Sequence, residues 1–415
     1  MDFSVLELPE AALPIFDITA VILGACIGSF LNVVILRLPA RQSLWSPPSH
    51  CPGCGHRIRP WENVPVISWL ALRARCSACR HTISWRYPLI EACTGIVFFL
   101  LWRRVSGEVY PLQTLPALLF LASWMIAAGI IDLEHRIIPD RINMTGIIAA
   151  VVLAVILPYG QLQLSTVGSG VLTVLPETGS EWNGDLLDYS FLRIRLAAGI
   201  NLVLGVAAGT LPLLLLRWSG GRLWGKSRNR PESGGTARLL FKKGRFELNS
   251  LQAEELESYL KQGKHIVLQA QSLEGVTRDG TRIGSNERHS APSPQKSVLR
   301  ISSREVRIDQ KRIPVSQLER LVADISEWSL PREVLGLGDV KLMAVAGAFA
   351  GPQGVLMIIF LSSFSGCCAG VLLWLAKKLT LEKTLSFGPF ITLGTLVWLL
   401  AGERVMDIFL IFRLY

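Results

Sequence analysis

Residues 342–376, LMAVAGAFAGPQGVLMIIFLSSFSGCCAGVLLWLA, contain no charged side chain and decide the class of the fold. A helix needs roughly 20 apolar residues to cross a bilayer, so this stretch is too long for one span, and Gly351-Pro352 should divide it into two. The 415-residue chain is 50% hydrophobic and 18% charged, with a mean hydropathy of +0.40. Soluble domains carry about 25% charged residues, so an ordinary globular enzyme and a disordered protein are both excluded.

Further apolar stretches on both sides of this one predict an all-α polytopic membrane protein with about eight transmembrane helices. We therefore expect a first span (18–37), a cysteine-rich cytoplasmic domain (38–86), spans two to four (87–158), a periplasmic loop (159–190), a fifth span (191–217), a cytoplasmic insertion (218–335) and spans six to eight (336–403).

The charges of the loops predict which side of the membrane each loop faces. Loop 38–86 holds seven arginines, whereas loop 159–190 has no Lys or Arg and four acids. Positively charged loops stay in the cytoplasm, so both termini should lie outside. Residues 1–17 contain no base and lack the features of a signal peptide, so we expect them in the mature protein.

The insertion 218–335 differs in composition from the spans and predicts a small mixed α/β module. A basic, Gly-rich stretch should form a flexible tether. Its basic residues can hold the module against anionic lipid, at about 1 kcal/mol for each base near the surface. Nucleic-acid binding is not expected, because no aromatic platform or known motif is present. The expected elements are a tether over 219–235, a helix over 251–262 and strands over 265–271, 298–303 and 306–308.

Two C-x-x-C pairs in the loop 38–86 predict a metal site. Cys51-Pro52-Gly53-Cys54 and Cys76-Ser77-Ala78-Cys79 are separated by about 20 residues. Four thiolates in two such pairs suit a closed, structural, tetrahedral zinc site, which would fold a loop too small to build its own core. The alternatives are redox-active or unpaired cysteines, and iron bound by the same ligands. Cys26, Cys93, Cys367 and Cys368 lie in apolar spans and are expected as buried small hydrophobes.

Two aspartates stand where spans meet the cytoplasm. Asp132 closes the third predicted span, and Asp339 opens the sixth after Gly336-Leu337-Gly338, whose missing side chains permit close approach of another helix or a substrate. The simpler interpretation is a pair of helix-end carboxylates at the interface. The functional interpretation is favoured because both acids fall at the same membrane level. Glu134 and Asp140 are rivals for the role of the first acid, although both are expected to be solvated loop residues.

Two carboxyl groups held together cannot both ionise, so one stays protonated while the other acts as a base. Such a pair can activate a water molecule and protonate the leaving amine. This chemistry is peptide hydrolysis without a catalytic metal or a covalent intermediate.

The motifs of the chain resemble those of the bacterial type IV prepilin peptidases, which are membrane aspartic proteases of the G-x-G-D class. The motifs occur in family order. They are GSFLNVV (28–34) with RLP (37–39), CPGC, ENVPVISWL, CSAC, ISWRYPLIE, IDLEHRIIPD, GLGDVKL and FGPF (387–390). They cover about residues 20–145 and 335–400.

The resemblance implies an inner-membrane enzyme that removes a short basic leader from type IV prepilin or type II secretion pseudopilin precursors on the cytoplasmic side. Many members then N-methylate the new amino terminus with S-adenosylmethionine, for which the residues themselves carry no signature. The implied catalytic acids are Asp132 and Asp339. The implied zinc ligands are Cys51, Cys54, Cys76 and Cys79. Six further residues lie in matched motifs, with structural roles and substrate contact both open: Glu62, Asn63, Arg86, Tyr87, Glu91 and Lys341.

Two other functions stay open beside the peptidase. One is an inactive, zinc-stabilised membrane scaffold whose insertion binds a partner, although intact acids at both positions argue against it. The other is a transporter that uses the acids as a proton relay, which predicts acids deeper within the spans.

The insertion lengthens the chain between the two aspartates well beyond the compact form of the family. Because it enters just before the G-x-G-D segment, it could gate access or recruit a partner.

Overall fold

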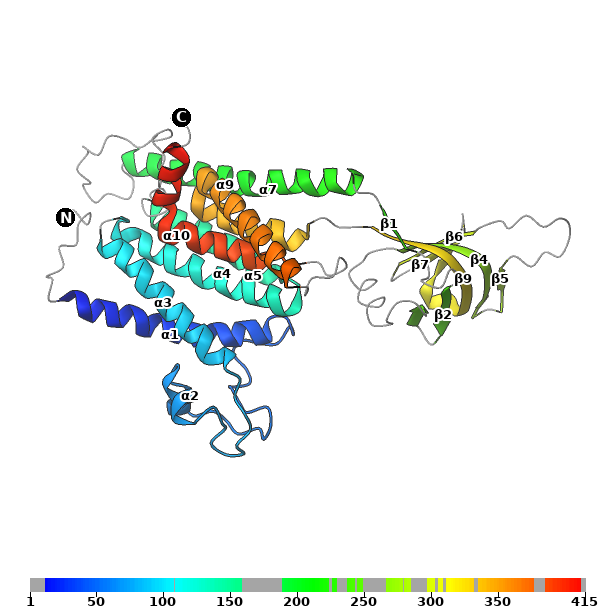
Figure 1. Cartoon of the computed structure of the whole chain (residues 1–415), viewed down its shortest axis with the longest axis horizontal. Coiled ribbons are helices and arrows are strands. Elements are labelled where there is room, and N and C mark those ends of the chain that lie inside the picture. Colours follow the sequence, from blue (N-terminus) through cyan, green and yellow to red (C-terminus); the bar gives the residue numbers. More distant parts are fainter. Residues whose placement is uncertain are drawn as a thin grey trace. The chain divides into compact units, whose positions relative to one another are not determined.

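The computed structural model describes residues 12–107, 109–158, 189–223, 226–229, 237–242, 245–248, 266–278, 280–284, 297–302, 305–308, 311–331, 335–376 and 385–411. The chain forms two compact units, each with a core of its own (Figure 1). Residues 1–214 and 335–415 form the helical unit. Residues 215–334 form the second unit, called the β-domain below.

Long apolar helices build the helical unit. They are α1 (Leu13–Arg37), α3 (Arg86–Ser106), α4 (Leu115–His135), α5 (Asp140–Ile156), α7 (Tyr189–Leu223), α9 (Leu337–Leu375) and α10 (Gly388–Ile411). Five of these, α1, α4, α7, α9 and α10, are long and apolar enough to cross a membrane. The chain is therefore a multi-pass membrane protein. Helices α3 and α5 do not meet that criterion, so the number of about eight spans stays a prediction.

Helix α9 is interrupted where the sequence predicts a break. Gly351 has φ +67° and ψ −178° between two helical segments, and Pro352 follows it. A side chain would strain the backbone at this φ, and proline cannot donate the next helical hydrogen bond. The break divides α9 into the two segments expected from the sequence.

Glycines allow α1 to pack closely on α3. A Cβ atom at Gly24 would lie 2.7 Å from the Cα of Gly95, and one at Gly28 would lie 2.7 Å from the Cα of Glu91. Small residues at these positions let the two helix backbones approach, as is typical of membrane helices. The cysteine-rich loop, with the short helices η2 (Pro60–Asn63) and α2 (Ile67–Ala71), connects α1 to α3.

The β-domain is an antiparallel sheet with the order β3-β2-β9-β4-β6-β7-β8, to which β1 adds on β9 and β5 on β4. Alternate residues of its strands are buried in one hydrophobic cluster, as in β4, where Ile266, Leu268 and Ala270 point inward. The strands are β1 (Lys226–Asn229), β2 (Ala237–Lys242), β3 (Arg245–Leu248), β4 (Ile266–Thr277), β5 (Arg282–Gly284), β6 (Ser297–Ile301), β7 (Glu305–Ile308), β8 (Lys311–Pro314) and β9 (Leu318–Pro331).

Several expectations for the insertion need correction. The described residues of the β-domain beyond α7 form strands, turns and the short 3₁₀ helix η4 (Val315–Gln317). The predicted helix over 251–262 lies outside the described residues. The flexible tether expected over 219–235 is wrong at both described parts, because α7 continues to Leu223 and 226–229 form β1. The three predicted strands coincide with β4, β6 and β7. The long strand β9 was not expected, and its pairing with both β2 and β4 organises the sheet.

The four cysteines of the apolar spans also differ from expectation. Cys26, Cys93, Cys367 and Cys368 are exposed on helix surfaces rather than buried in the bundle. An apolar helix surface is stable against lipid, so a small hydrophobic residue in a span need not face another helix.

Candidate active site and metal centre

Asp132 lies in the last turn of α4 and is only 6% exposed. Its Oδ2 accepts a hydrogen bond of 2.9 Å from the backbone N–H of Gly388 and another from the hydroxyl of Ser386. Arg136 ends the helix in a left-handed conformation at φ +53° and donates its N–H to the Asp132 carbonyl. The sequence predicted that Asp132 closes the third span, whereas the helix continues to His135. The carboxylate is therefore held by a rigid element and by two donors from the segment that begins α10.

Asp339 lies in the first turn of α9, where unpaired backbone N–H groups favour a negative charge. Its Oδ2 would lie 3.2 Å from a Cβ atom at Gly336, and a Cβ atom at Gly338 would lie 3.1 Å from the Cβ of Ile138. The two glycines thus leave room for the Asp339 carboxylate on one side and for the segment after α4 on the other. This is the close approach that the G-x-G pattern predicts.

Asp132 and Asp339 are about 200 residues apart in the sequence, and they lie near the ends of α4 and α9, two helices that contact each other. The rival acids are engaged elsewhere. Glu134 accepts a hydrogen bond of 2.9 Å from Arg86, and Asp140 lies 2.5 Å from the ammonium group of Lys341. Both rivals are exposed residues in ion pairs with bases. Asp132 and Asp339 form no ion pair with a base among the described residues.

Sequence reasoning missed Ser386 and the role of Gly388. The FGPF motif contains Gly388 but suggests no contact, and nothing in the sequence marks Ser386. A Cβ atom at Gly388 would lie 2.5 Å from Asp132 Oδ2, so a residue without a side chain is required at this position. The contact joins residues more than 250 positions apart, which only the packing of α10 on α4 brings together.

The four cysteines of the two C-x-x-C pairs form one cluster. Their sulfur atoms all lie within 4.8 Å of one another, with Cys51 and Cys76 buried and Cys54 and Cys79 exposed. The two pairs have the same local fold, since Cys51 and Cys76 each donate their N–H to a carbonyl five residues later. Backbone N–H groups of Cys79 and Ala78 lower the pKa of Cys76 to about 6. The cluster is compatible with a structural zinc ion, whose ligands are thiolates.

Two glutamates accept hydrogen bonds from backbone N–H groups of the cysteine-rich loop. Glu62 accepts the backbone N–H of Arg59, which with the Ser77 hydroxyl lowers the pKa of Glu62 to about 2. Glu91 of α3 accepts the backbone N–H of Val66 at 2.7 Å and is 8% exposed. These contacts, with the Arg86–Glu134 and Lys341–Asp140 pairs, give structural roles to four of the motif residues whose roles the sequence left open.

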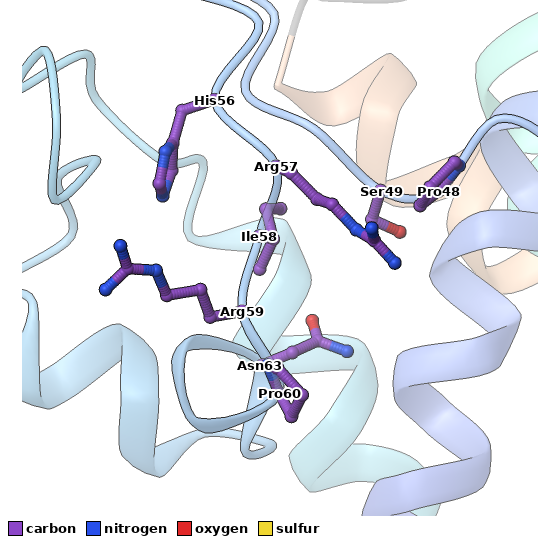
Figure 2. A pocket seen from close by; sticks show the side chains of 8 residues that line it. All are labelled: Pro48, Ser49, His56, Arg57, Ile58, Arg59, Pro60 and Asn63. Atoms are coloured by element: carbon purple, nitrogen blue, oxygen red, sulfur yellow. The ribbon is translucent and has the colours of Figure 1, made fainter.

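Two cavities lie beside the cysteine-rich loop. A cavity of about 610 Å³ is lined by this loop alone, and Arg57 and Arg59 extend to opposite sides of the backbone there (Figure 2). A second cavity of about 810 Å³ is lined by the same loop together with residues of α1 and α3, including Asn32, Tyr87 and Glu91. Asn63 lines both. Neither cavity includes Asp132 or Asp339, so each is separate from the paired acids.

Two family models match the chain. Residues 22–105 match the model described as Bacterial Peptidase A24 N-terminal domain. Residues 119–216 and 321–371 match the model described as Type IV leader peptidase family. The first match contains the cysteine cluster, and the second contains both aspartates.

Curated relatives agree with these models. The chain is 44% identical over 165 residues to a protein of Myxococcus xanthus named prepilin leader peptidase/N-methyltransferase, covering 40% of this chain and 48% of that protein. It is 38% identical over 175 residues to the type 4 prepilin-like proteins leader peptide-processing enzyme of Escherichia coli, covering 36% and 61%. The chain therefore spans about half the length of the curated relatives it matches. No solved structure matches it.

Proposed function

We propose, from the premise that the chain belongs to the type IV leader peptidase family, that it is an aspartic endopeptidase of the bacterial inner membrane. Its proposed substrates are type IV prepilin or type II secretion pseudopilin precursors, whose basic leaders it would remove at the cytoplasmic side. The observation that supports the proposal is the position of Asp132 and Asp339 near the ends of α4 and α9, two helices that contact each other.

The hydrogen bonds of Asp132 support a fixed orientation of its carboxylate. Ser386 and Gly388 both donate to Asp132 Oδ2, which fixes the orientation of this carboxylate and leaves its other oxygen free of those donors. One acid of the pair would take a proton from the attacking water, and the other would give its proton to the leaving amine. A basic leader would be oriented by the negative charge of the pair.

The experiment is co-expression with a tagged prepilin precursor, with leader removal measured by intact mass. Asp132→Asn and Asp339→Asn keep size and hydrogen bonding but cannot exchange a proton, so each should reduce cleavage at least about 100-fold. Matched controls are Glu134→Gln and Asp140→Asn, which change neighbouring acids that form ion pairs and should cleave normally. Cleavage that survives in both aspartate variants would refute the paired-acid mechanism. Loss of cleavage in a control variant would give a rival acid the catalytic role. The inactive-scaffold alternative requires that the unaltered chain fails to cleave.

We also infer a structural zinc ion bound by Cys51, Cys54, Cys76 and Cys79. The compact cluster of four sulfur atoms supports it, and a closed site of four thiolates leaves no coordination position for substrate. Because η2, α2 and their turns bury few side chains, the ion would supply most of the stability of this loop.

N-methylation of the new amino terminus is a second candidate activity, which the names of the relatives suggest and the cavity of about 810 Å³ supports. Asn32 lines this cavity, is 3% exposed, and has no hydrogen-bond partner for its Oδ1 among the described residues. Glu91 adds a carboxylate to the same wall. Both groups accept hydrogen bonds, so they fit the ammonium group and positive charge of S-adenosylmethionine, which supplies a reactive methyl group when bound.

Binding of labelled S-adenosylmethionine to the purified chain tests this second activity. Leu72 lines the cavity and Leu70 does not, so Leu72→Trp should weaken binding at least about tenfold while Leu70→Trp binds normally. Both variants should still remove the leader, because the cavity excludes the paired acids. A cleaved product that never gains the mass of one methylene group would contradict methylation and leave the peptidase proposal intact.

A further inference from the structure

Three arginines form a row across three neighbouring strands of the β-domain, called the arginine row below. Arg300 of β6 is paired in register with Arg307 of β7, and Arg307 is paired in register with Arg312 of β8. Directly paired residues of antiparallel strands project from the same face, with their Cβ atoms about 5 Å apart. The three side chains therefore leave the sheet side by side.

The arginine row lies on the face opposite the core. Leu299 and Ile301 flank Arg300 along β6, and Val306 and Ile308 flank Arg307 along β7. All four are buried in the hydrophobic cluster of the domain. Because successive side chains of a strand alternate between faces, the arginines point away from this core. Arg300 and Arg312 are exposed, and Arg307 is partly exposed.

The positive charge of the row is only partly neutralised. Glu305 lies two residues before Arg307 on β7 and forms an ion pair of 2.5 Å with it. Arg300 and Arg312 have no acidic partner within the part of the chain that the structure describes, whereas Arg238 on β2 pairs with Asp324. Like charges directly opposite one another destabilise a sheet, so a bound anion would remove a cost that the row otherwise imposes.

We propose that the arginine row binds the phosphate groups of anionic phospholipids. The planar guanidinium group donates two parallel hydrogen bonds to phosphate, and three side by side offer such donors to the phosphates of a lipid surface. Lipid is favoured over other anions because both ends of the domain are joined to apolar helices by short connections. Strand β1 begins at Lys226 soon after α7 ends at Leu223, and α9 begins at Leu337 soon after β9 ends at Pro331.

Nucleic acid is the competing anion, and the row lacks what single strands require. Their recognition combines basic groups with aromatic side chains on which bases stack. The outward positions of β6, β7 and β8 beside the arginines are Val298, Glu305 and Pro314. None of these is aromatic.

Covalent footprinting of the full chain in lipid nanodiscs tests the proposal. Phenylglyoxal modifies accessible arginines, and mass spectrometry measures the labelling rate at each site. In discs that contain phosphatidylglycerol, labelling of Arg300 and Arg312 should be at least about fivefold slower than in phosphatidylcholine discs. Arg278 and Arg320 are exposed arginines away from the row and serve as controls within the same sample. Their rates should be equal in the two kinds of disc.

Further conditions of the same experiment distinguish anionic lipid from other phosphate-containing ligands. High salt should remove the protection, because screening weakens contacts between exposed charges. In the double variant Arg300→Gln/Arg312→Gln, protection of Arg307 by phosphatidylglycerol should fall, whereas Arg278→Gln/Arg320→Gln should keep it. The proposal is overturned by equal labelling in both kinds of disc, or by equal protection of the control arginines. It is also overturned if inorganic phosphate or duplex DNA protects the row in phosphatidylcholine discs as well as the anionic lipid does. None of these outcomes depends on the peptidase activity.

Discussion

The orientation of Asp132 depends on two residues that are more than 250 positions away. Ser386 and Gly388 reach its Oδ2 because α10 packs against the end of α4. A donor with a fixed backbone position holds a carboxylate more precisely than water does, and positioning of this kind is a large part of catalysis. The glycine at the start of α10 therefore helps to position the proposed catalytic carboxylate.

Substitution of Gly388 tests this contact. In Gly388→Ala the new methyl group would lie 2.5 Å from Asp132 Oδ2, so the carboxylate must move and leader cleavage should fall at least about 100-fold. Gly370→Ala is the matched control, because its Cβ would meet its nearest neighbour, a methyl group of Leu385, at 3.9 Å. The measurement is the initial rate of leader removal at equal amounts of membrane-inserted protein. A rate for Gly388→Ala equal to that of the control would show that this contact does not position Asp132.

Among the elements, the cysteine-rich loop combines very short helices with several backbone turns of positive φ. Arg41, Val66, Arg73, Ala74 and Arg80 all have positive φ without being glycine, a conformation that costs energy for each residue. Such a loop needs a compensating interaction. The four-cysteine cluster and the Glu62 and Glu91 contacts are the ones the structure provides.

Metal analysis tests the contribution of the cluster. The purified chain should contain one zinc ion, measured by elemental analysis, and Cys51→Ser should lose it together with the protection of the loop from protease. Cys93→Ser is the control, because Cys93 lies on an exposed surface of α3 outside the cluster. Iron in place of zinc would support the four cysteine ligands but would show that the predicted metal is wrong. Full occupancy in Cys51→Ser would refute the four-cysteine site.

At the scale of the whole molecule, two separate cores explain how a large insertion coexists with paired acids. The hydrophobic cluster of the helical unit and that of the β-domain share no residue. The entropic cost of closing a longer loop grows only slowly with its length, so Asp132 and Asp339 can still meet with the β-domain inserted between them.

Deletion of residues 236–330 tests this independence. Replaced by a short Gly/Ser linker, the variant should still insert, and thermal unfolding of its helical unit should shift by only a few degrees, because no core contact of that unit is lost. A variant that fails to fold would show that the two cores are coupled. Leader cleavage is measured in the same samples. An unchanged rate would remove the hypothesis that the insertion gates access to the acids.

Local sequence patterns predicted much of the secondary structure and the metal site of this molecule. The break at Gly351-Pro352, the two C-x-x-C pairs and the alternating strands β4, β6 and β7 all follow from interactions between near neighbours, which composition and spacing record. The resemblance of the ordered motifs also predicted the family, which the family models confirm.

Long-range contacts lay beyond those patterns. The donors to Asp132, the pairing of the rival acids with Arg86 and Lys341, and the pairing of β9 with β2 and β4 all join residues that the sequence separates. A hydrogen bond or a strand register depends on where two backbones meet, and apolar helices and antiparallel strands can pack in several ways at similar local cost. The sequence by itself determined most of the elements and the kinds of chemistry available, whereas tertiary packing decided which acids, bases and glycines meet across the fold.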